Sequence, residues 1–179
     1  YPDAGVGGPS GDAWFDNFQE NLTGLTWTQM RSGSAGTLEN GNSDSPASAA
    51  GLYGNSDNSC RRIYRSAITF DTSSLGTGAT ISAATFSVFG SSKFDGLTLT
   101  PNLNVYVFSG SAYNIPASEY AIANWGSTAL CDTAITYAGF SVVAYNDLAL
   151  NATGLSTISK TGITKLGTRN ANYDVADSP

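Results

Sequence analysis

The chain has 179 residues and carries 14 acidic against 8 basic side chains, with no histidine, which gives a formal net charge of −6. Such a chain lacks the basic surface that holds a phosphate backbone, so nucleic acid is not expected as a partner. Only 12% of the residues are charged, and 20 glycines with many Ser, Thr, Ala and Asn residues replace them, a composition typical of secreted or surface β-proteins.

We therefore expect one domain over residues 1–179, located outside the cell or on a cell or virion surface. No apolar run approaches the roughly 18 residues that cross a bilayer, so no membrane span is expected. Residues 1–60 hold clusters of Gly, Ser, Asn and Asp, which predict a loop-rich N-terminal part. Within it, the alternation in LTWTQMR, residues 25–31, predicts a strand with Trp27 in the core.

Residues 62–90 predict a strand, a turn and a second strand that together form the core hairpin of the fold. Alternate residues from 64 to 70 share one face, Asp71 caps the turn, and residues 84–88 repeat the period of two. The same region holds a small basic run. Arg61 and Arg65 share one face of the strand and Arg62 takes the other, which predicts a solvated edge.

Further strands are predicted around residues 103–107, 135–137 and 148–150, and over GITKLGTRN, residues 162–170. Residues 151–162 predict a short helix with Thr153 as N-cap and Gly162 as C-cap, and a second short helix is predicted at 118–123. Many short strands with turns between them predict an all-β fold. We expect an antiparallel β-sandwich of jelly-roll type with one or two short helices.

The chain has two cysteines, Cys60 and Cys131. Two thiols without any histidine are too few for a structural zinc site. In an oxidising compartment a disulfide between them would stabilise the fold by about 4 kcal/mol on the chain-entropy model. We expect that bridge, with two buried free thiols as the alternative.

The sequence offers little for catalysis. Glycosidic cleavage needs two carboxyl groups flanking the bond, but the chain has only three glutamates, Glu20, Glu39 and Glu119, and its aspartates lie mostly in turn contexts. The Ser and Cys hydrolase templates also fail, because there is neither a histidine nor a nucleophile motif. We expect a protein that is not an enzyme and that needs no catalytic cofactor.

Two tryptophans are candidates for carbohydrate binding. Trp14 and Trp125 lie beside Gly-rich or polar loops, where an exposed ring could stack on a sugar; burial in the core is the alternative. The chain could instead carry glycans, because three asparagines begin N-glycosylation acceptor patterns: Asn21, Asn151 and, in the rarer form that ends in cysteine, Asn58. Asn151 could also use its side chain to turn the backbone before the short helix.

The residues RSAITFDTSSLGTGATISAATFSVFG from Arg65 and YNDLALNATGLSTISKTGITKLGTR from Tyr145 resemble the DNRLRE-type domains, as does the opening YPDAG. These are jelly-roll sandwiches of secreted and cell-surface proteins, often classed with carbohydrate-binding modules, and the two stretches are also similar to segments of uncultured-phage structural proteins. The resemblance implies a structural Ca²⁺ site, for which Asp3, Asp12 and Asp16 are the candidates, with solvated turn aspartates as the alternative.

Domains of this kind continue into a last strand beyond a stretch such as YDVADSP. If that strand is missing, an unpaired sheet edge is left, which a strand from a neighbouring copy could close to build a filament. We therefore expect a non-enzymatic structural subunit, a candidate glycoprotein, that forms a surface filament or virion-like structure from copies of itself. The alternative is a carbohydrate-binding module that recognises a polysaccharide through Trp14 and Trp125.

Overall fold

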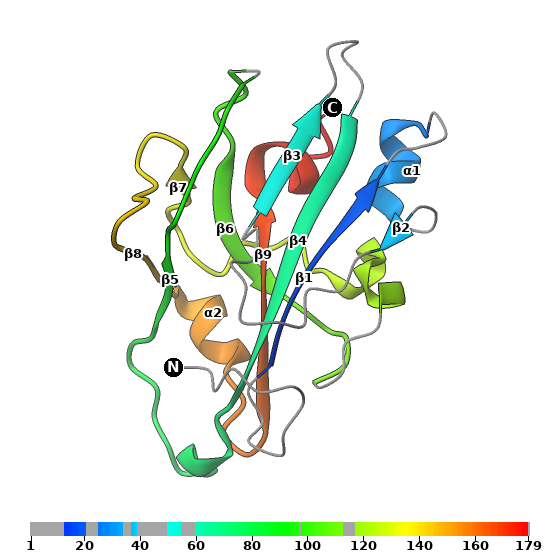
Figure 1. The fold of residues 1–179 in the computed structure, drawn as a ribbon. Helices are drawn as coiled ribbons and strands as arrows, with labels where there is room; N and C mark the ends of the chain where they lie inside the picture. Colours follow the sequence, from blue (N-terminus) through cyan, green and yellow to red (C-terminus); the bar gives the residue numbers. More distant parts are fainter. Residues whose placement is uncertain are drawn as a thin grey trace.

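The computed structural model describes residues 13–20, 25–33, 37–38, 50–54, 60–96, 98–112 and 117–178. These residues form two antiparallel sheets and a few short helices, so the fold is all-β (Figure 1). Within these ranges no helix has the length and apolar character needed to cross a bilayer. Of the predicted sites, Asp3, Asp12, Asn21 and Asn58 lie outside the described residues.

The larger sheet has the strand order β2-β1-β4-β9-β6-β7, with β3 also paired to β4. Its strands are β1 (Ala13–Glu20), β2 (Thr37–Leu38), β3 (Ala50–Gly54), β4 (Cys60–Asp71), β6 (Asn102–Val107), β7 (Ile135–Thr136) and β9 (Ile163–Asn170). The smaller sheet consists of β5 (Thr85–Phe89) and β8 (Tyr145–Ala149). Three of these strands, β1, β2 and β3, lie in the N-terminal part, where the sequence predicted mainly loops.

The central strand of the larger sheet is β4. On one side it pairs with β1. On the other side its first half pairs with β3, where Ala50 lies opposite Arg65, and its second half pairs with β9, where Thr168 lies opposite Ser66. Strand β9 leaves the sheet at Asn170 and continues into the turn η4 (Ala171–Val175), which lies between β3 and β6 in Figure 1.

The two sheets meet in the main apolar core. Phe86 of β5 and Leu148 of β8 pack with Val105 of β6 and Leu166 of β9, and Phe70 of β4 meets Phe86 edge-to-face, with ring centroids 6.4 Å apart. The predicted strands are therefore found at β4, β5 and β6. Alternating burial holds in β5, whereas β6 has four consecutive buried residues, 103–106. The predicted core hairpin is wrong, because β4 and β5 belong to different sheets and β5 pairs with β8.

Residues 25–31 were predicted to be a strand, but they contain the helix α1 (Trp27–Ser32). The Thr26 hydroxyl accepts a hydrogen bond from the Gln29 backbone N–H, and the Gln29 side chain accepts one from the Thr26 N–H. This capping box satisfies two free donors at the start of the helix. The helix ends at Gly33, whose φ of 70° favours glycine and where a Cβ would lie 2.7 Å from the Tyr120 ring.

The remaining helices are short. Helix α2 (Ala152–Thr157) was predicted, but its N-cap is Asn151 rather than Thr153, and it ends well before Gly162. Asp71 accepts a hydrogen bond from Ser73 N at 2.9 Å, as expected for a turn cap, and the single-turn helix η1 (Ser73–Leu75) follows. The second predicted helix is found as two 3₁₀ turns, η2 (Ala117–Tyr120) and η3 (Ile122–Asn124).

Candidate functional site

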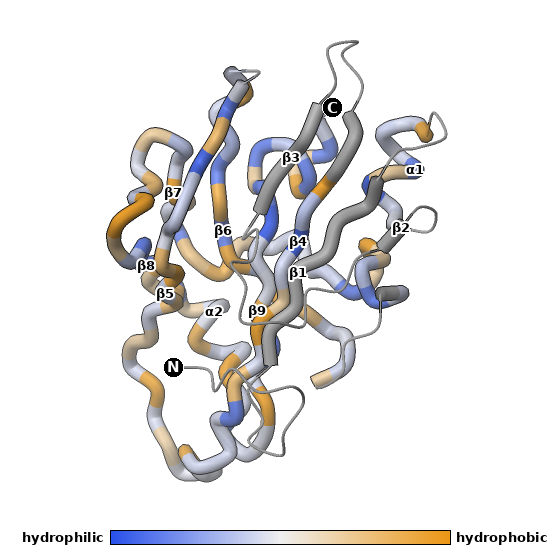
Figure 2. Tube along the Cα trace, viewed as in Figure 1, coloured by the Kyte–Doolittle hydropathy of each residue, from blue (hydrophilic) through white to orange (hydrophobic). Residues whose placement is uncertain are grey.

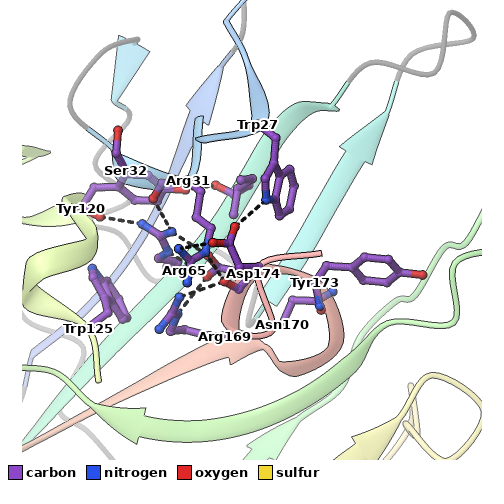
Figure 3. A network of polar contacts seen from close by, with 12 residues as sticks. Trp27, Arg31, Ser32, Arg65, Tyr120, Trp125, Arg169, Asn170, Tyr173 and Asp174 are labelled. Atoms are coloured by element: carbon purple, nitrogen blue, oxygen red, sulfur yellow. Dashed lines mark hydrogen bonds and ion pairs between the residues drawn. The ribbon is translucent and has the colours of Figure 1, made fainter. Parts of the chain in front are cut away.

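A cluster of buried charges lies where β4, β9, α1 and η4 meet (Figure 3). Arg65 of β4 and Arg169 of β9 are fully buried, and so is Asp174 of η4. The Asp174 carboxylate accepts two hydrogen bonds from Arg65, at 2.7 Å and 2.8 Å, and one from Arg169 Nε at 2.8 Å. We call these three residues, with Arg31 of α1, the arginine clamp.

Backbone carbonyl groups accept hydrogen bonds from other guanidinium donors of the clamp. Arg65 donates to Tyr120 O at 2.9 Å and to Arg31 O at 2.7 Å, and Arg169 donates to Gly126 O at 2.7 Å. The Arg65 guanidinium also lies over the Tyr120 ring, 4.5 Å from its centroid. Buried arginine is tolerated only when its charge and its donors are satisfied in this way.

Arg31 extends the clamp toward the surface. Its Nε donates to the backbone carbonyl of Asp174, and its Nη1 lies 3.3 Å from Asp177 Oδ2. Trp27 of the same helix donates from its indole nitrogen to Asp177 Oδ1 at 2.9 Å. Two elements distant in the sequence, α1 and β4, together with the adjoining β9, therefore hold the segment from Asn170 to Ser178 in place.

At Arg65, the clamp contradicts the expectation that the basic run forms a solvated edge; the side chains of Arg61 and Arg62 lie outside the described ones. The neighbours of Arg65 on its face of β4, Ile63, Ala67 and Thr69, are buried as well. Both carboxylate oxygens of Asp174 are engaged by arginine, so the carboxylate cannot act as an acid or a base on a ligand. We interpret the clamp as a structural device that positions η4.

The clamp predicts a loss of stability in acid. Burial alone would raise the pKa of Asp174, but the hydrogen bonds and charge of Arg65, followed by those of Arg169, lower it from 3.8 to about 2. Because the folded pKa is depressed, this stabilisation is complete above about pH 4 and is lost as the pH falls through about 2. We expect it to be worth roughly 2 kcal/mol, measurable by urea unfolding between pH 5 and pH 2.

A matched variant isolates this contribution. In an Asp174→Asn protein, the part of the acid dependence that comes from Asp174 should disappear, whereas Asp177→Asn should leave it unchanged. Equal slopes of stability against pH in the wild type and in Asp174→Asn would contradict the assignment.

Of the two candidate tryptophans, Trp125 lies in the core. Its side chain is 5% exposed, its ring centroid lies 4.9 Å from that of Phe108, and its indole nitrogen donates to Glu119 O at 3.1 Å. Gly167 of β9 lies against the same ring, where a Cβ would come within 2.6 Å. Trp125 therefore offers no ring face to a sugar. Trp14 is in β1, opposite Ile68 of β4.

The expected disulfide is not formed, because Cys131 is a free cysteine. Its side chain is buried in the main core beside Val105 and Leu148. Burial, with a smaller contribution from Asp132, raises the pKa of its thiol from 9.0 to about 11. Cys131 is therefore a buried free thiol, which was the alternative prediction. Cys60 is the first residue of β4.

Asn151 acts as the N-cap of α2, where its Oδ1 accepts a hydrogen bond from Gly154 N at 3.0 Å. Its Nδ2, the atom that would carry a glycan, donates to Asp132 Oδ1 at 2.9 Å and to Ala129 O at 3.3 Å. The alternative prediction for Asn151, that its side chain turns the backbone before the short helix, is therefore confirmed. Asp16, a calcium candidate, lies in β1 opposite Ser66, and no cluster of metal-ligating side chains occurs among the described residues.

The outer face of the β5–β8 sheet is the second candidate site. Phe89 and Tyr145, which lie opposite each other at one end of this sheet, are 60% and 51% exposed, and their rings meet edge-to-face with centroids 5.3 Å apart. Val143, just before β8, is 80% exposed. In the middle of the sheet Ser87 donates to Asp147 at 2.6 Å. We call this face, with Val143, the ribbon surface.

The carboxylates of Glu119 and Asp95 fix loops. Both side-chain oxygens of Glu119 bind Ser111, and those of Asp95 accept from the N–H groups of Leu99 and Thr100. Such bonds fix loop conformations.

Comparisons with protein-family models, with curated proteins and with solved structures find no match to this chain.

Sequence reasoning missed the arginine clamp and the ribbon surface. A partial signal for the clamp existed, because Arg65 occupies the same face of its strand as Ile63 and Ala67. For the ribbon surface, alternation around Phe86 and Leu148 places Phe89 and Tyr145 on the outer side once β5 and β8 are known to pair. That pairing spans about 60 residues and leaves no local pattern.

Proposed function

We propose that this chain is a non-enzymatic extracellular structural subunit that assembles with copies of itself. Its two sheets would form a sandwich of the jelly-roll type, as the resemblance to DNRLRE-type domains suggests. The observation that carries the proposal is the ribbon surface. Among the described residues, five large apolar side chains are exposed, and three of them, Phe89, Val143 and Tyr145, belong to it.

The physical setting of the ribbon surface favours association. A two-stranded sheet has two edges whose backbone groups are available to further strands, and such edges are templates for pairing with another chain. The low content of charged residues, 12%, leaves little electrostatic repulsion between copies that approach each other. The roles of Asp174, Glu119 and Asp95 in fixing structure support the non-enzymatic part of the proposal.

Replacing Val143 with lysine tests assembly. A lysine at this exposed position places a charge in the apolar part of the ribbon surface, so we expect self-association to weaken about tenfold or more, since about 1.4 kcal/mol corresponds to a factor of ten. The association constant is measured by sedimentation equilibrium, and the assemblies are imaged by electron microscopy.

The matched control is Leu75→Lys. Leu75 is also a large exposed apolar residue, but it lies in η1, at the far end of the segment that leads to β5. This variant should associate like the wild type. A wild-type protein that stays monomeric up to millimolar concentration would overturn the proposal.

Carbohydrate binding is the second candidate, favoured by the exposed rings of Phe89 and Tyr145 beside the Asp147 carboxylate. Aromatic faces with a nearby hydrogen-bond acceptor suit sugar recognition. In this second candidate function, Phe89 and Tyr145 take the place of Trp14 and Trp125 as the surface on which a sugar would stack. Two results together would favour this function. The wild-type protein would bind to a glycan array without associating with itself, and the Phe89→Ala variant would no longer bind.

A further inference from the structure

We propose that the assembly contact is made by the outer edge of β8, which pairs in antiparallel fashion with β8 of a second copy across a two-fold axis. The proposal rests on the function proposed above and names the strand, the register and the partner. It joins the two small sheets into one four-stranded sheet with the order β5-β8-β8-β5.

The hydrogen-bond pattern shows which backbone groups of β8 face outward. Gly90 N donates to Ala144 O and Leu150 N donates to Ala84 O, so the even-numbered residues of both strands make the bonds between β5 and β8. In an antiparallel pair, the intervening residues direct their N–H and C=O groups to the opposite edge. Asp147 and Ala149 therefore present their backbone groups at the outer edge of β8.

The middle of β8 is open to a second copy, whereas the end of the strand is covered, because Asn151 N donates to Leu130 O at 2.8 Å. Figure 1 shows β8 at the outer margin of the fold, whereas β5 lies on the side of the larger sheet. Both Asp147 and Ala149 are exposed, and Figure 2 shows that the chain entering β8 is hydrophobic. A partner strand at this edge would extend the small sheet without displacing the larger one.

Charge selects both the partner and the register. Asp147 is the one charged side chain of β5 and β8, so this edge carries only a single negative charge and no extended charged patch that would select a strongly charged ligand. Two registers of a symmetric pair are simplest. In the first register, Asp147 lies opposite Asp147 of the second copy, and two carboxylates directly opposite each other are destabilising. If the axis passes at Leu148, Asp147 faces Ala149 of the other copy and the repulsion is relieved.

This register forms four backbone hydrogen bonds, two of which are donated by the Ala149 N–H groups. Ala149→Pro removes these donors but no bond to β5, because the Ala149 N–H points away from β5. We expect self-association at least about 10-fold weaker, by sedimentation equilibrium, from the loss of two hydrogen bonds. Ala149→Val keeps the N–H and should associate like the wild type. Equal association of the proline and valine variants would overturn the proposal.

A cross-link tests the register directly. In the proposed pair, Asp147 of one copy lies opposite Ala149 of the other at about 5.5 Å between Cα atoms, within reach of a disulfide. Under mild oxidation, an equal mixture of Asp147→Cys and Ala149→Cys proteins should form a covalent dimer in much higher yield than either variant alone. The wild type controls for its own two cysteines.

The outcomes separate the two proposals. If the wild type associates but the mixture gives no excess of cross-linked dimer, the β8 contact is wrong and the assembly function stands. If Asp147→Cys alone cross-links best, the symmetric pair exists in the other register and the proposed one is wrong. If the wild type is monomeric throughout, the assembly function fails, and the β8 pair fails with it.

Discussion

Replacing Asp174 with asparagine is expected to destabilise the fold by about 3–5 kcal/mol, the usual cost of removing one partner from a buried ion pair. Asparagine keeps the size of the side chain but leaves Arg65 and Arg169, both fully buried, without a counter-charge. It also turns one acceptor oxygen into a donor that faces guanidinium N–H groups. The midpoint of urea unfolding, with an unchanged slope, measures the loss.

The control for this variant is Asp177→Asn. Asp177 also faces Arg31, but its side chain is 57% exposed. A surface ion pair contributes about 0–1 kcal/mol, so the control should remain close to the wild type. If both variants lost the same small amount, the clamp would not carry the stability that its burial implies.

Replacing Trp125 with alanine should cost about 3–5 kcal/mol, as for other large aromatic side chains in a core. The change opens a cavity between Phe108 and Gly167 and removes the hydrogen bond to Glu119 O. Trp27→Ala is the matched comparison. Trp27 is only half-buried in α1, so we expect a smaller loss. Thermal unfolding followed by circular dichroism measures both.

The same pair of variants tests the earlier interpretation of Trp125 as a sugar platform. A platform residue would lose glycan binding and leave the unfolding temperature nearly unchanged. A core residue would lower the unfolding temperature by many degrees, because about 1 kcal/mol shifts it by about 2–4 °C in a domain of this size. An unfolding temperature that is unaffected by Trp125→Ala would contradict the core assignment.

Much of the strand content could be predicted from local alternation. The period of two over residues 64–70 and 103–107 corresponds to β4 and β6, and GITKLGTRN corresponds to β9. The strand predicted at 25–31 was wrong. The prediction rested on the alternation of apolar residues and threonines and gave too little weight to a helix-capping signal in the same residues. The pattern Thr26-x-x-Gln29 is a capping box and could have identified the helix α1.

Other features depend on pairings that no local pattern shows. The predicted hairpin failed because β5 pairs with β8, about 60 residues later, instead of with β4. The clamp joins Arg65 to Asp174 across 109 positions. Arg169 lies only five residues before Asp174, but no acidic residue near Arg65 in the sequence marks it as a member of the clamp. Burial of Arg65 follows from tertiary packing, which overrides the usual exposure of arginine.

The clamp also affects how the chain folds while it is being synthesised. Arg65 emerges from the ribosome 109 residues before the carboxylate that neutralises it. At about 5–20 residues per second, the interval is roughly 5 to 20 s. During that time β4 cannot bury its arginine in the native way, so the central strand stays accessible to chaperones. The nascent protein should therefore resist protease only after Asp174 has been released, as a late and abrupt event.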